Sequence, residues 1–432
     1  MKYENYKDSG IEWIGEVPSH WEVMPIKRTG SFENGLTYSP TDICDENGVL
    51  VLRSSNIQND KLNFEDNVYV AKCPLSLLVK SGDIIICSRN GSASLVGKCA
   101  IVEGNINATY GAFMMRYRPI CKSNTVFSYY LLQTALKFYK GLYSTTTINQ
   151  LTKGVIGQIY VSYPPFPEQQ AIATYLDKKC GEINHAIDVQ KKKIDLLGEL
   201  KQTIITDAVT KGLNPNATMK DSGMEWIGQV PQHWEVMRLR FVCEFRNGYT
   251  PSKANPDFWV KGTIPWYRME DIREKGRFLN EANQYITKEA VKGNGLFEAG
   301  SFILATTATI GEHAVLIVDS LANQQFTNLK IRKSLIHRVV RDFFFYYLFV
   351  IDNYCKSTTR VATFPAVNMN DLKNFCVTLP SIQEQQSIVA HIEKKITKID
   401  SQITKANRRI ELLEELKQSI ITEAVTGKIK VC

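Results

Sequence analysis

The sequence has 432 residues, an apolar content of 44% and a formal net charge of +8 at pH 7. This length has room for two or three domains, and the ordinary apolar content argues against a disordered chain. The modest positive charge permits a polyanionic partner but does not by itself establish one.

The ten cysteines form no C-x-x-C pair and no cluster of ligand spacing with the six histidines. We therefore expect no metal site and no cofactor. The chain starts without an evident signal peptide, which favours reduced thiols and a cytoplasmic location. The most apolar run, residues 343–351, is too short to span a bilayer and is typical of a core helix, so we expect no membrane partner.

A segment rich in Trp, Gly and Pro occurs twice near the starts of the two halves. Residues 7–27 (KDSGIEWIGEVPSHWEVMPIK) recur at 220–240 (KDSGMEWIGQVPQHWEVMRLR), with 15 of 21 positions identical. The composition predicts an irregular loop that leads into a strand beginning near Trp21 and Trp234. Trp13 and Trp226 could be functional aromatics, but we favour buried anchors that fix the loop against the long helices described below.

Each copy is followed by a region of mixed strand and helix. Short β-rich runs at 49–52 and 83–87, and at 264–267 and 301–305, predict strands. A helix is expected at 126–139 and another at 342–354. The order of elements agrees between the halves although the residues largely differ, which indicates one architecture used on two different targets.

Two long helices are predicted from a heptad pattern that begins at 167 and returns 216 residues later. Of the 46 residue pairs from Glu168/Glu384 onward, 21 are identical. Apolar residues at a and d positions indicate two helices that pack on each other, each a rod of roughly 60 Å. The expected seam comprises Ala173, Leu176, Cys180, Ile183, Ile187, Ile194, Leu197, Ile204, Val389, Ile392, Ile396, Ile399, Ile403, Ile410, Leu413 and Ile420.

The ends of both helices carry recognisable signals. Glu168 lies in the first turn, where a negative charge favours the helix dipole. Ser381 and Glu384 form an S-x-x-E capping box. Gly212 and Gly427 follow the periodic runs, where a left-handed cap is expected.

Two features inside the helices need an explanation. Gly181 and Gly198 interrupt the first helix at about 1 kcal/mol each relative to Ala, so it should be the weaker one. Lys201 and Lys417 both occupy an a position of the seam. A polar residue there either fixes the register of the pair or, near a helix end, simply reaches water, and the sequence leaves both readings open.

These features together resemble the specificity subunit of type I restriction–modification systems. The resemblance is carried by the paired D-S-G-x-E-W-I-G-x-V-P-x-H-W-E segments and the paired P-x-x-x-E-Q-Q-x-I helix entries. The helix endings L-L-x-E-L-K-Q-x-I-I-T-x-A-V-T match as well. Both halves align, so the resemblance covers the whole chain, while the middle of each half matches only as a type of domain.

The resemblance implies an α+β fold with two globular mixed α/β target-recognition domains in a pseudo-two-fold arrangement, separated by two long antiparallel coiled-coil helices. The expected domains are 1–165 and 213–380, with spacer helices at 166–212 and 381–432. Each domain would read one half of a bipartite site in double-stranded DNA. The helices would set the spacing and dock two methyltransferase subunits, and restriction/translocase subunits would join the complex.

The sequence predicts no catalytic site. Ser162–Phe166 reads S-Y-P-P-F, but Tyr163 stands where an amino-methyltransferase needs Asn or Asp. We find no P-loop lysine, no PD-(D/E)xK triad and no G-x-S-x-G elbow. The chain is therefore predicted to be non-catalytic on its own. The alternatives are a self-contained methyltransferase or nuclease and a coiled-coil adaptor that binds protein.

Candidate DNA-reading residues are polar side chains in loops that follow predicted strands. In the first half they are Asn34, Tyr38, Arg53, Ser54, Asn56, Ser88, Arg89, Asn90, Thr145, Thr146 and Asn149. In the second half they are Asn247, Tyr249, Lys253, Arg268, Glu270, Thr306, Thr307, Thr309, Arg360 and Thr363. The alternative is that many are turn formers or surface polar groups. Arg89 and Arg360 are favoured because each lies in a polar loop without an obvious local acid.

Three glycines in these loops have a different expected role. Gly91, Gly97 and Gly311 should shape the backbone rather than contact DNA.

Overall fold

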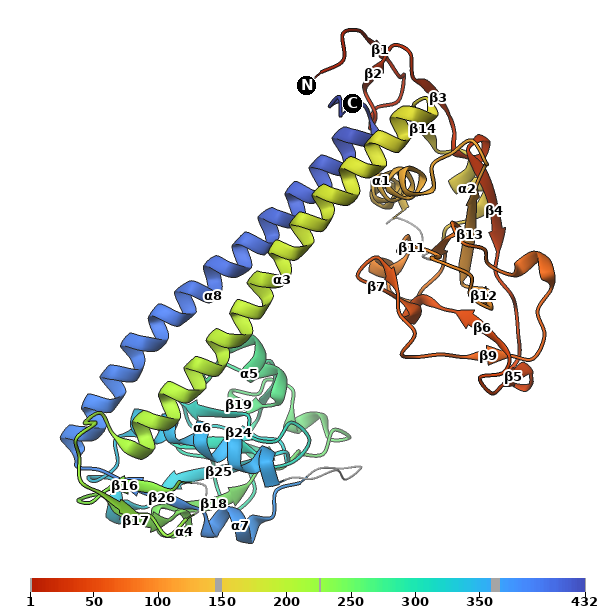
Figure 1. The fold of residues 1–432 in the computed structure, drawn as a ribbon. Helices are drawn as coiled ribbons and strands as arrows, with labels where there is room; N and C mark the ends of the chain where they lie inside the picture. Colours follow the sequence, from red (N-terminus) through yellow and green to blue (C-terminus); the bar gives the residue numbers. More distant parts are fainter. Residues whose placement is uncertain (1, 144–149, 225–226, 359–365, 432) are drawn as a thin grey trace. The chain divides into compact units, whose positions relative to one another are not determined.

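The computed structural model describes residues 2–143, 150–224, 227–358 and 366–431. The chain forms two compact units, one of residues 1–190 with 407–432 and the other of residues 191–406. Each unit combines helices with small sheets (Figure 1), so the expected mixed fold class is confirmed. In the described part of the chain, no helix is both long and apolar enough to cross a bilayer.

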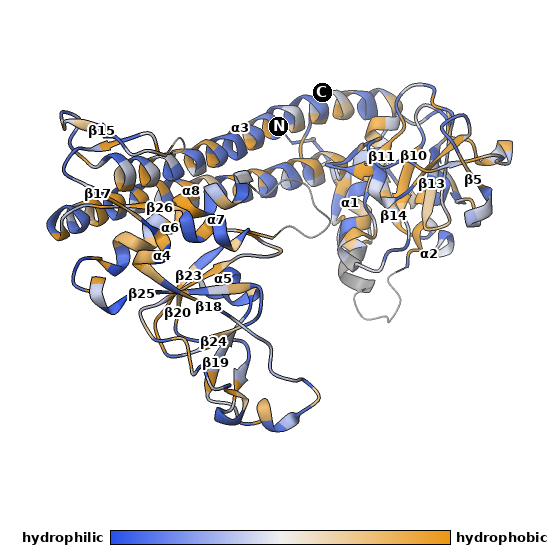
Figure 2. Cartoon of the chain, turned by 90° about the horizontal axis from the view of Figure 1, so that it is seen from below, coloured by the Kyte–Doolittle hydropathy of each residue, from blue (hydrophilic) through white to orange (hydrophobic). Residues whose placement is uncertain are grey.

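Two long helices run through both units. α3 (Phe166–Lys211) and α8 (Ile382–Val425) lie side by side in Figures 1 and 2. Ser162, just before α3, donates its hydroxyl to the carbonyl of Val425 at 2.6 Å. Thr378, just before α8, donates to the carbonyl of Val209 at 2.8 Å. Because the start of each helix meets the end of the other, the pair is antiparallel, as predicted.

The seam between α3 and α8 follows the heptad along most of its length. Leu176, Ile183, Ile187, Leu197, Ile392 and Ile399 are all less than 10% exposed. Ile194, Ile403, Ile410 and Leu413 are half-buried, because two helices alone cannot shield every seam position from water.

Near the helix ends the most buried position lies one residue after the predicted seam position. Ile205 and Ile421 are buried there, at 0% and 2% exposure, whereas Ile204 and Ile420 are half-buried. Ile205 and Ile421 each belong to the core of a globular part. The buried face therefore turns by one residue where the helices pack on the domains as well as on each other.

The two seam lysines have different partners. Lys201 donates to Asp400 on α8 at 2.8 Å, which supports the register interpretation for this position. The Nζ atom of Lys417 lies 3.7 Å from the Oδ2 atom of Asp60. Asp60 is in the turn between β7 (Ile57–Gln58) and β8 (Lys61–Leu62). Lys417 thus connects α8 to a globular hairpin rather than to α3, which neither reading of the sequence foresaw.

The expected helix caps are confirmed. The backbone N–H and the hydroxyl of Ser381 donate to Glu384 at 3.1 and 2.9 Å, and the backbone N–H of Glu384 donates back to the Ser381 hydroxyl. Gly212 and Gly427 have φ of +76° and +73°. A left-handed backbone there ends each helix, and only glycine adopts it without strain.

The repeated Trp-rich segments pack on the starts of the long helices. Trp21 and Trp234 are 0% and 1% exposed, and their indole N–H groups donate to Glu168 and Glu384 at 2.9 and 3.3 Å. Partial burial alone would raise the pKa of Glu168, but hydrogen bonds from Trp21, His20 and Tyr3 outweigh burial and lower that pKa. These tryptophans precede β3 (Glu22–Pro25) and β17 (Glu235–Arg238), as expected.

Trp13 is half-buried rather than fully buried, and it packs against the core of the first unit, to which α1 (Thr125–Tyr143) and both long helices contribute. Its ring lies 5.6 Å from that of Phe138 on α1. Trp226 lies outside the described residues. Trp21 is the better anchor because its N–H reaches a carboxylate in the first turn of α3.

The globular part of the first unit contains two four-stranded sheets and α1. The first sheet has the order β11-β10-β13-β4 and is antiparallel. Its strands are β4 (Gly30–Asn34), β10 (Ile84–Cys87), β11 (Cys99–Ile101) and β13 (Met114–Pro119). The second sheet has the order β12-β6-β9-β5, with β12 parallel to β6. Its strands are β5 (Ile43–Cys44), β6 (Val49–Leu52), β9 (Tyr69–Val70) and β12 (Ala108–Tyr110).

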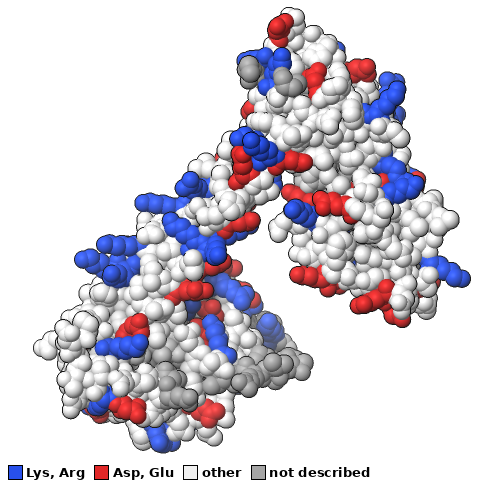
Figure 3. Space-filling model, in the orientation of Figure 1, with Lys and Arg blue, Asp and Glu red and all other residues white. Residues whose placement is uncertain are grey.

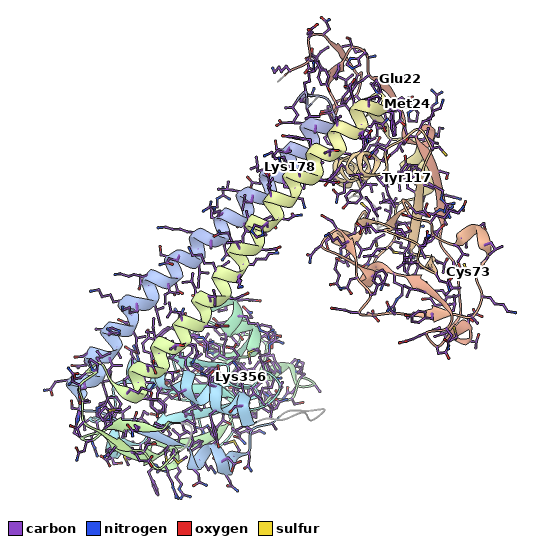
Figure 4. All side chains as sticks on the ribbon, in the orientation of Figure 1. Glu22, Met24, Cys73, Tyr117, Lys178 and Lys356 are labelled. Atoms are coloured by element: carbon purple, nitrogen blue, oxygen red, sulfur yellow. The ribbon has the colours of Figure 1, made fainter. Side chains whose placement is uncertain are left out.

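The core of this part lies between the first sheet and α1, where Figure 2 shows hydrophobic residues in orange. Tyr117 of β13, labelled in Figure 4, is 1% exposed, and its hydroxyl lies 2.7 Å from that of Thr29. Outside the two sheets, β1 (Tyr6–Asp8) pairs with β2 (Glu16–Pro18), and β14 (Tyr160–Tyr163) pairs with β3. α2 (Lys153–Gly157) precedes β14.

The globular part of the second unit repeats this plan. One sheet has the order β18-β25-β22-β23-β20 and the other β21-β19-β24. The strands are β18 (Cys243–Asn247), β19 (Ile264–Tyr267), β20 (Phe278–Leu279), β21 (Tyr285–Ile286), β22 (Phe302–Ala305), β23 (His313–Leu316), β24 (Leu321–Ala322) and β25 (Phe326–Ile331). The helices are α4 (Leu239–Val242), α5 (Met269–Lys275), α6 (Arg341–Thr358) and α7 (Met369–Asn374). β15 (Met219–Asp221) pairs with β16 (Gln229–Pro231), and β17 pairs with β26 (Cys376–Leu379).

The strands and helices predicted within the halves are confirmed. Two of the strand predictions coincide with β6 and β19, and β10 and β22 each begin one residue later than expected. α1 and α6 extend beyond the predicted helices at both ends. The boundaries between globular and helical segments stay a prediction.

Replacing Gly198 by alanine should stabilise the protein. No atom lies within 4 Å of a Cβ built at this exposed position of α3. Gly198→Ala should therefore raise the free energy of unfolding by about 1 kcal/mol, because alanine loses less backbone entropy in a helix. Chemical denaturation followed by circular dichroism measures the change.

Gly212→Ala is the matched control and should destabilise, because its φ is +76° and the Trp234 ring lies 3.0 Å from the new Cβ. A Gly198→Ala variant no more stable than the parent protein would contradict the interpretation of this glycine as a weak point.

Candidate nucleic-acid interface

In the first unit, the backbone segments that follow several strands converge at one end of the first sheet. The N–H of Gly35, just after β4, donates to the carbonyl of Met114 at 3.1 Å, and that of Leu36 donates to Tyr110 at 2.7 Å. A Cβ on Gly35 would collide with the carbonyl oxygen of Gly111. Only glycine lets the chain after β4 pass so close to the turn between β12 and β13.

The chain after β10 joins the same place. The N–H and the hydroxyl of Ser88 both donate to the carbonyl of Phe113, at 2.9 and 3.0 Å. Arg89 forms a β-bridge with Gln150. We call residues 34–38, 53–56, 88–90, 111–113 and 150 the strand-end cluster of the first unit.

The second unit forms the same backbone hydrogen bonds with different residues, and we call this shared set of bonds the frame. The N–H of Gly248 donates to the carbonyl of Phe326 at 2.8 Å, and the N–H of Thr306 donates to the carbonyl of Gln325 at 2.9 Å. A Cβ on Gly248 would collide with the carbonyl oxygen of Asn323. The corresponding bridge joins Thr307 to Ala366.

We call residues 247–253, 268–271, 306–309, 323–325 and 366 the strand-end cluster of the second unit. Its side chains differ from those of the first cluster at most corresponding positions. Four residues recur: Asn34, Gly35, Thr37 and Arg53 correspond to Asn247, Gly248, Thr250 and Arg268. Gly-Ala-Phe at 111–113 corresponds to Asn-Gln-Gln at 323–325, and Ser-Arg at 88–89 to Thr-Thr at 306–307.

Comparison with known proteins identifies the family. The family profile described as "Type I restriction modification DNA specificity domain" matches residues 18–193 and again 231–414. The chain belongs to this family. Each match contains one strand-end cluster, so the chain carries two specificity domains.

Full-length relatives agree with this result. The chain is 26% identical over its whole length to a putative type I restriction enzyme MjaX specificity subunit of Methanocaldococcus jannaschii, of which 98% is covered. It is 42% identical over 165 residues to the EcoprrI specificity subunit of Escherichia coli. That match covers 38% of this chain and 41% of the relative.

A solved structure shares the fold. It comes from work on complex assembly and conformational transition of the type I R-M system, and it superposes with a TM-score of 0.70 at 16% identity. The alignment covers 96% of this chain and 99% of that chain. At this identity the likeness supports the fold alone.

In the first specificity domain, the structure brings three of the predicted readers together. The side-chain amide of Asn90 donates to the Ser54 hydroxyl at 3.2 Å. Arg89 is exposed, and its guanidinium lies over the ring of Phe113 at 5.4 Å from the centroid. No ion pair of Arg89 occurs among the residues that the structure describes.

Two other predicted readers of the first domain, Asn56 and Arg53, stabilise the loop after β6 through contacts within it. Asn56 is fully buried, and its amide donates to the carbonyls of Asn63 and Asp66 at 3.0 Å each. Arg53 forms an ion pair with Asp66 at 2.8 Å. Asn34, exposed at the end of β4, and the half-buried Tyr38 flank the Gly35 crossing. Thr145, Thr146 and Asn149 lie outside the described residues.

In the second domain, Thr306 is 7% exposed and its hydroxyl lies 3.1 Å from that of Thr327. Thr327 also donates to Asn247 at 3.2 Å. Thr307 and Thr309 are half-buried, whereas Lys253 is exposed. Thr306 is therefore a framework residue, and its neighbours are the accessible ones.

The remaining candidates of the second domain have local partners. The Nε atom of Arg268 lies 3.4 Å from the Oε2 atom of Glu270. The Tyr249 hydroxyl donates to the Ala290 carbonyl at 3.1 Å and accepts a hydrogen bond from the N–H of Lys292. Arg360 and Thr363 lie outside the described residues.

Sequence reasoning missed the turn residues Phe113, Gln324 and Gln325. Phe113 is not polar, and the strands that flank these turns, β12, β13, β24 and β25, were not among the predicted strands. The useful signal is the geometry of the turn, which the strand pattern alone does not reveal.

Two buried side chains near these frames, Tyr110 and His313, have strongly shifted pKa values. Burial raises the pKa of Tyr110, beside the Gly35 crossing, to about 12. Burial, together with the nearby charge of Arg277, lowers the pKa of His313 on β23 to about 3. Both side chains are therefore uncharged near pH 7 and contribute packing rather than charge. Within the described ranges, no group of His, Cys, Asp and Glu has the geometry of a metal site.

The predicted shaping role is confirmed for two of the three loop glycines. Gly97 and Gly311 have φ of +87° and +90°. Gly91 has no positive φ, and a Cβ there would have open space, so its predicted role is wrong.

Gly35→Ala tests whether the frame depends on the close crossing. The new Cβ would collide with a main-chain carbonyl, which cannot move without disturbing the turn at 111–113. The free energy of unfolding should fall by about 2 kcal/mol, the typical cost of forcing an extra carbon into a packed site. Chemical denaturation measures this loss.

Gly91→Ala, in the loop after β10, is the control and should leave stability unchanged within about 0.5 kcal/mol. Equal stability of the two variants would show that the crossing tolerates a side chain.

Proposed function

We propose that this chain is the DNA-sequence-recognition subunit of a type I restriction–modification complex, and that each specificity domain reads one half of a bipartite duplex site. The observation that carries this proposal is the repeated hydrogen-bond frame that presents unlike side chains in the two domains. A common frame explains why both domains approach DNA in the same way. Different side chains on it explain why they would read different bases.

The chemistry of the first cluster suits a duplex groove. Arg89, Asn90 and Ser54 offer donors and acceptors of the kind that read base edges. Arg89 has a partner in the Phe113 ring, which orients its guanidinium without neutralising its charge. A positive, oriented group at a strand-end cluster is suited to guanine or to phosphate.

The long helices are proposed to set the distance between half-sites. α3 has 46 residues and α8 has 44, and each continues from one unit into the other. At 1.5 Å per residue, each helix is about 65–70 Å long. Half-sites on one side of B-DNA are about 34–36 Å apart, so helices of this length are sufficient as a spacer.

The helices also carry two equivalent apolar patches. Leu196 and Leu200 on α3 are 54% and 48% exposed, and Leu412 and Leu416 on α8 are each 48% exposed. The two pairs are related by the same offset of 216 residues. Figure 3 shows charged side chains elsewhere along the helix pair. Paired leucines one turn apart are typical of a surface that packs against another helix.

We propose that each leucine pair docks one methyltransferase subunit, which gives two copies per chain. The restriction/translocase subunits would join the same complex. The chain itself is proposed to be non-catalytic and cytoplasmic, with methyl transfer and cleavage supplied by its partners.

A duplex-binding titration against salt tests the proposal and separates it from a protein adaptor. The full chain with its methyltransferase subunits should bind its site with an affinity that falls steeply as salt rises, because phosphate contacts release counterions. An adaptor would bind no duplex. Methylation by the isolated chain would instead support the enzyme alternative.

Arg89→Ala should weaken binding to the cognate duplex by about 1–3 kcal/mol if Arg89 reads a guanine. Loss of a phosphate contact would instead weaken all sequences alike. Fluorescence anisotropy on cognate duplexes and on duplexes with one changed base pair distinguishes the two cases. Arg28→Ala, at an exposed arginine outside the cluster, serves as the control. Unchanged affinity and unchanged half-site preference would remove Arg89 from the interface.

Removing one leucine pair should remove one partner. The double variant Leu196→Ser with Leu200→Ser should retain a single methyltransferase subunit, because each buried leucine contributes about 1.5–3 kcal/mol to docking. Native mass spectrometry of the purified complex counts the copies.

The double variant Leu412→Ser with Leu416→Ser should give the same result. Leu75→Ser, at a leucine that is 85% exposed on the first domain, should keep both copies. Two bound copies in every variant would place the docking surface elsewhere.

A further inference from the structure

The turn between β12 and β13, residues 111–113, and the corresponding turn at 323–325 were not among the expected reading elements. We infer that this turn reads a base in each half-site, with Phe113 contacting a thymine methyl group and Gln325 pairing with an adenine. The inference rests on the proposed function and assigns the base class that one position in each domain would recognise.

Hydrogen bonds from the segments after β10 and β22 fix the backbone of each turn. In the first domain the carbonyl of Phe113 accepts three hydrogen bonds, from the N–H and hydroxyl of Ser88 and from the N–H of Arg89 at 3.1 Å. In the second domain the carbonyl of Gln325 accepts from the N–H and the hydroxyl of Thr306, at 2.9 and 3.5 Å. A side chain on such a turn is preorganised, so little conformational entropy is lost when it meets DNA.

The Phe113 side chain is unusually exposed for its position. Its neighbours Tyr110 and Tyr117 are 0% and 1% exposed, whereas Phe113 is 59% exposed. A phenylalanine ring that stays exposed does not contribute to the stability of its own domain. The Phe113 ring would gain free energy if a ligand buried it. The Arg89 guanidinium over its ring adds a cation close to the apolar surface.

The corresponding residue in the second domain is a glutamine with a fixed amide. The side-chain amide of Asn323 donates to the Gln325 Oε1 atom at 3.2 Å. This bond orients the Gln325 amide and leaves its oxygen with a second lone pair. A glutamine amide can pair with the N6 and N7 positions of adenine in the major groove.

The substitution of one residue type for the other fits this interpretation. Aromatic rings contact the thymine C5-methyl group, and glutamine amides pair with adenine, so each residue reads one partner of an A·T pair. The same backbone position would then distinguish the two half-sites by side chain alone. The competing explanation is that Phe113 only supports Arg89 and contacts no base.

Replacing thymine by uracil in the duplex separates these explanations, because uracil lacks only the methyl group. The probe is the cognate bipartite duplex, with uracil introduced at one thymine at a time, bound to the full chain with its methyltransferase subunits. At one thymine of the first domain's half-site, the parent protein should bind the uracil duplex about fivefold more weakly.

Phe113→Ala should bind the thymine and uracil duplexes at that position equally. Tyr160→Ala, at an aromatic residue that is 43% exposed on β14, should keep the parent preference. A Phe113→Ala variant with the parent ratio at every thymine overturns the inference, as does a half-site of the first domain without an A·T pair.

The second domain is tested with 7-deazaadenine, which lacks the N7 acceptor. The parent protein should lose about fivefold in affinity at one adenine of the other half-site, and Gln325→Ala should lose this discrimination. Gln232→Ala, at an exposed glutamine after β16, is the control and should behave like the parent. An unchanged ratio in Gln325→Ala overturns this half of the inference.

The outcomes for the inference and for the proposed function are distinct. If the parent complex binds a bipartite site but neither turn variant alters base preference, the turn is not a reader and the proposed function stands. If the parent complex binds every duplex equally or none, the proposed function itself fails.

Discussion

The structure depends on the packing of α3 against α8. Leu176 and Ile392 of the seam are fully buried, and each end of the pair is closed by a hydroxyl that caps a carbonyl of the opposite helix. An isolated helix of this polarity would gain little from propensity alone, so most of its stability comes from this shared apolar face. Each end of the helix pair joins the core of its own unit, so the same kind of packing stabilises each specificity domain.

The two domains show how a duplicated scaffold can acquire different specificities. Their backbone hydrogen bonds coincide, and Gly35 and Gly248 permit the same close crossing. The backbone frame is costly to change, since a Cβ at either glycine would collide with a carbonyl. The side chains that the frame presents are free of this constraint, and it is there that the two halves differ.

Much of this fold follows from the sequence. The heptad repeat located α3 and α8, and Gly212, Gly427 and Ser381 marked their ends, because periodicity and capping are local properties of the chain. The two tryptophans of the first repeated segment show the limit. Trp13 is half-buried, whereas Trp21 is fully buried and donates its N–H to Glu168, a residue 147 positions away in the sequence.

The candidate site was harder to predict for the same reason. Asn56 has the residue type and loop position of a DNA reader, yet its amide is used by carbonyls seven and ten residues away. Phe113 lacks the residue type but lies at the strand-end cluster, because pairing between β10 and β13 brings its turn there. Such long-range pairings are not visible in local patterns.

We propose that the same frame, used twice with unlike side chains, reads two unlike half-sites, and that the long helices set the distance between them. The direct test is to sequence the methylated positions in the genome of cells that carry the complete system. One motif is expected, composed of two different half-sites separated by a gap of constant length. A single uninterrupted motif, two identical half-sites or a gap of variable length would contradict it.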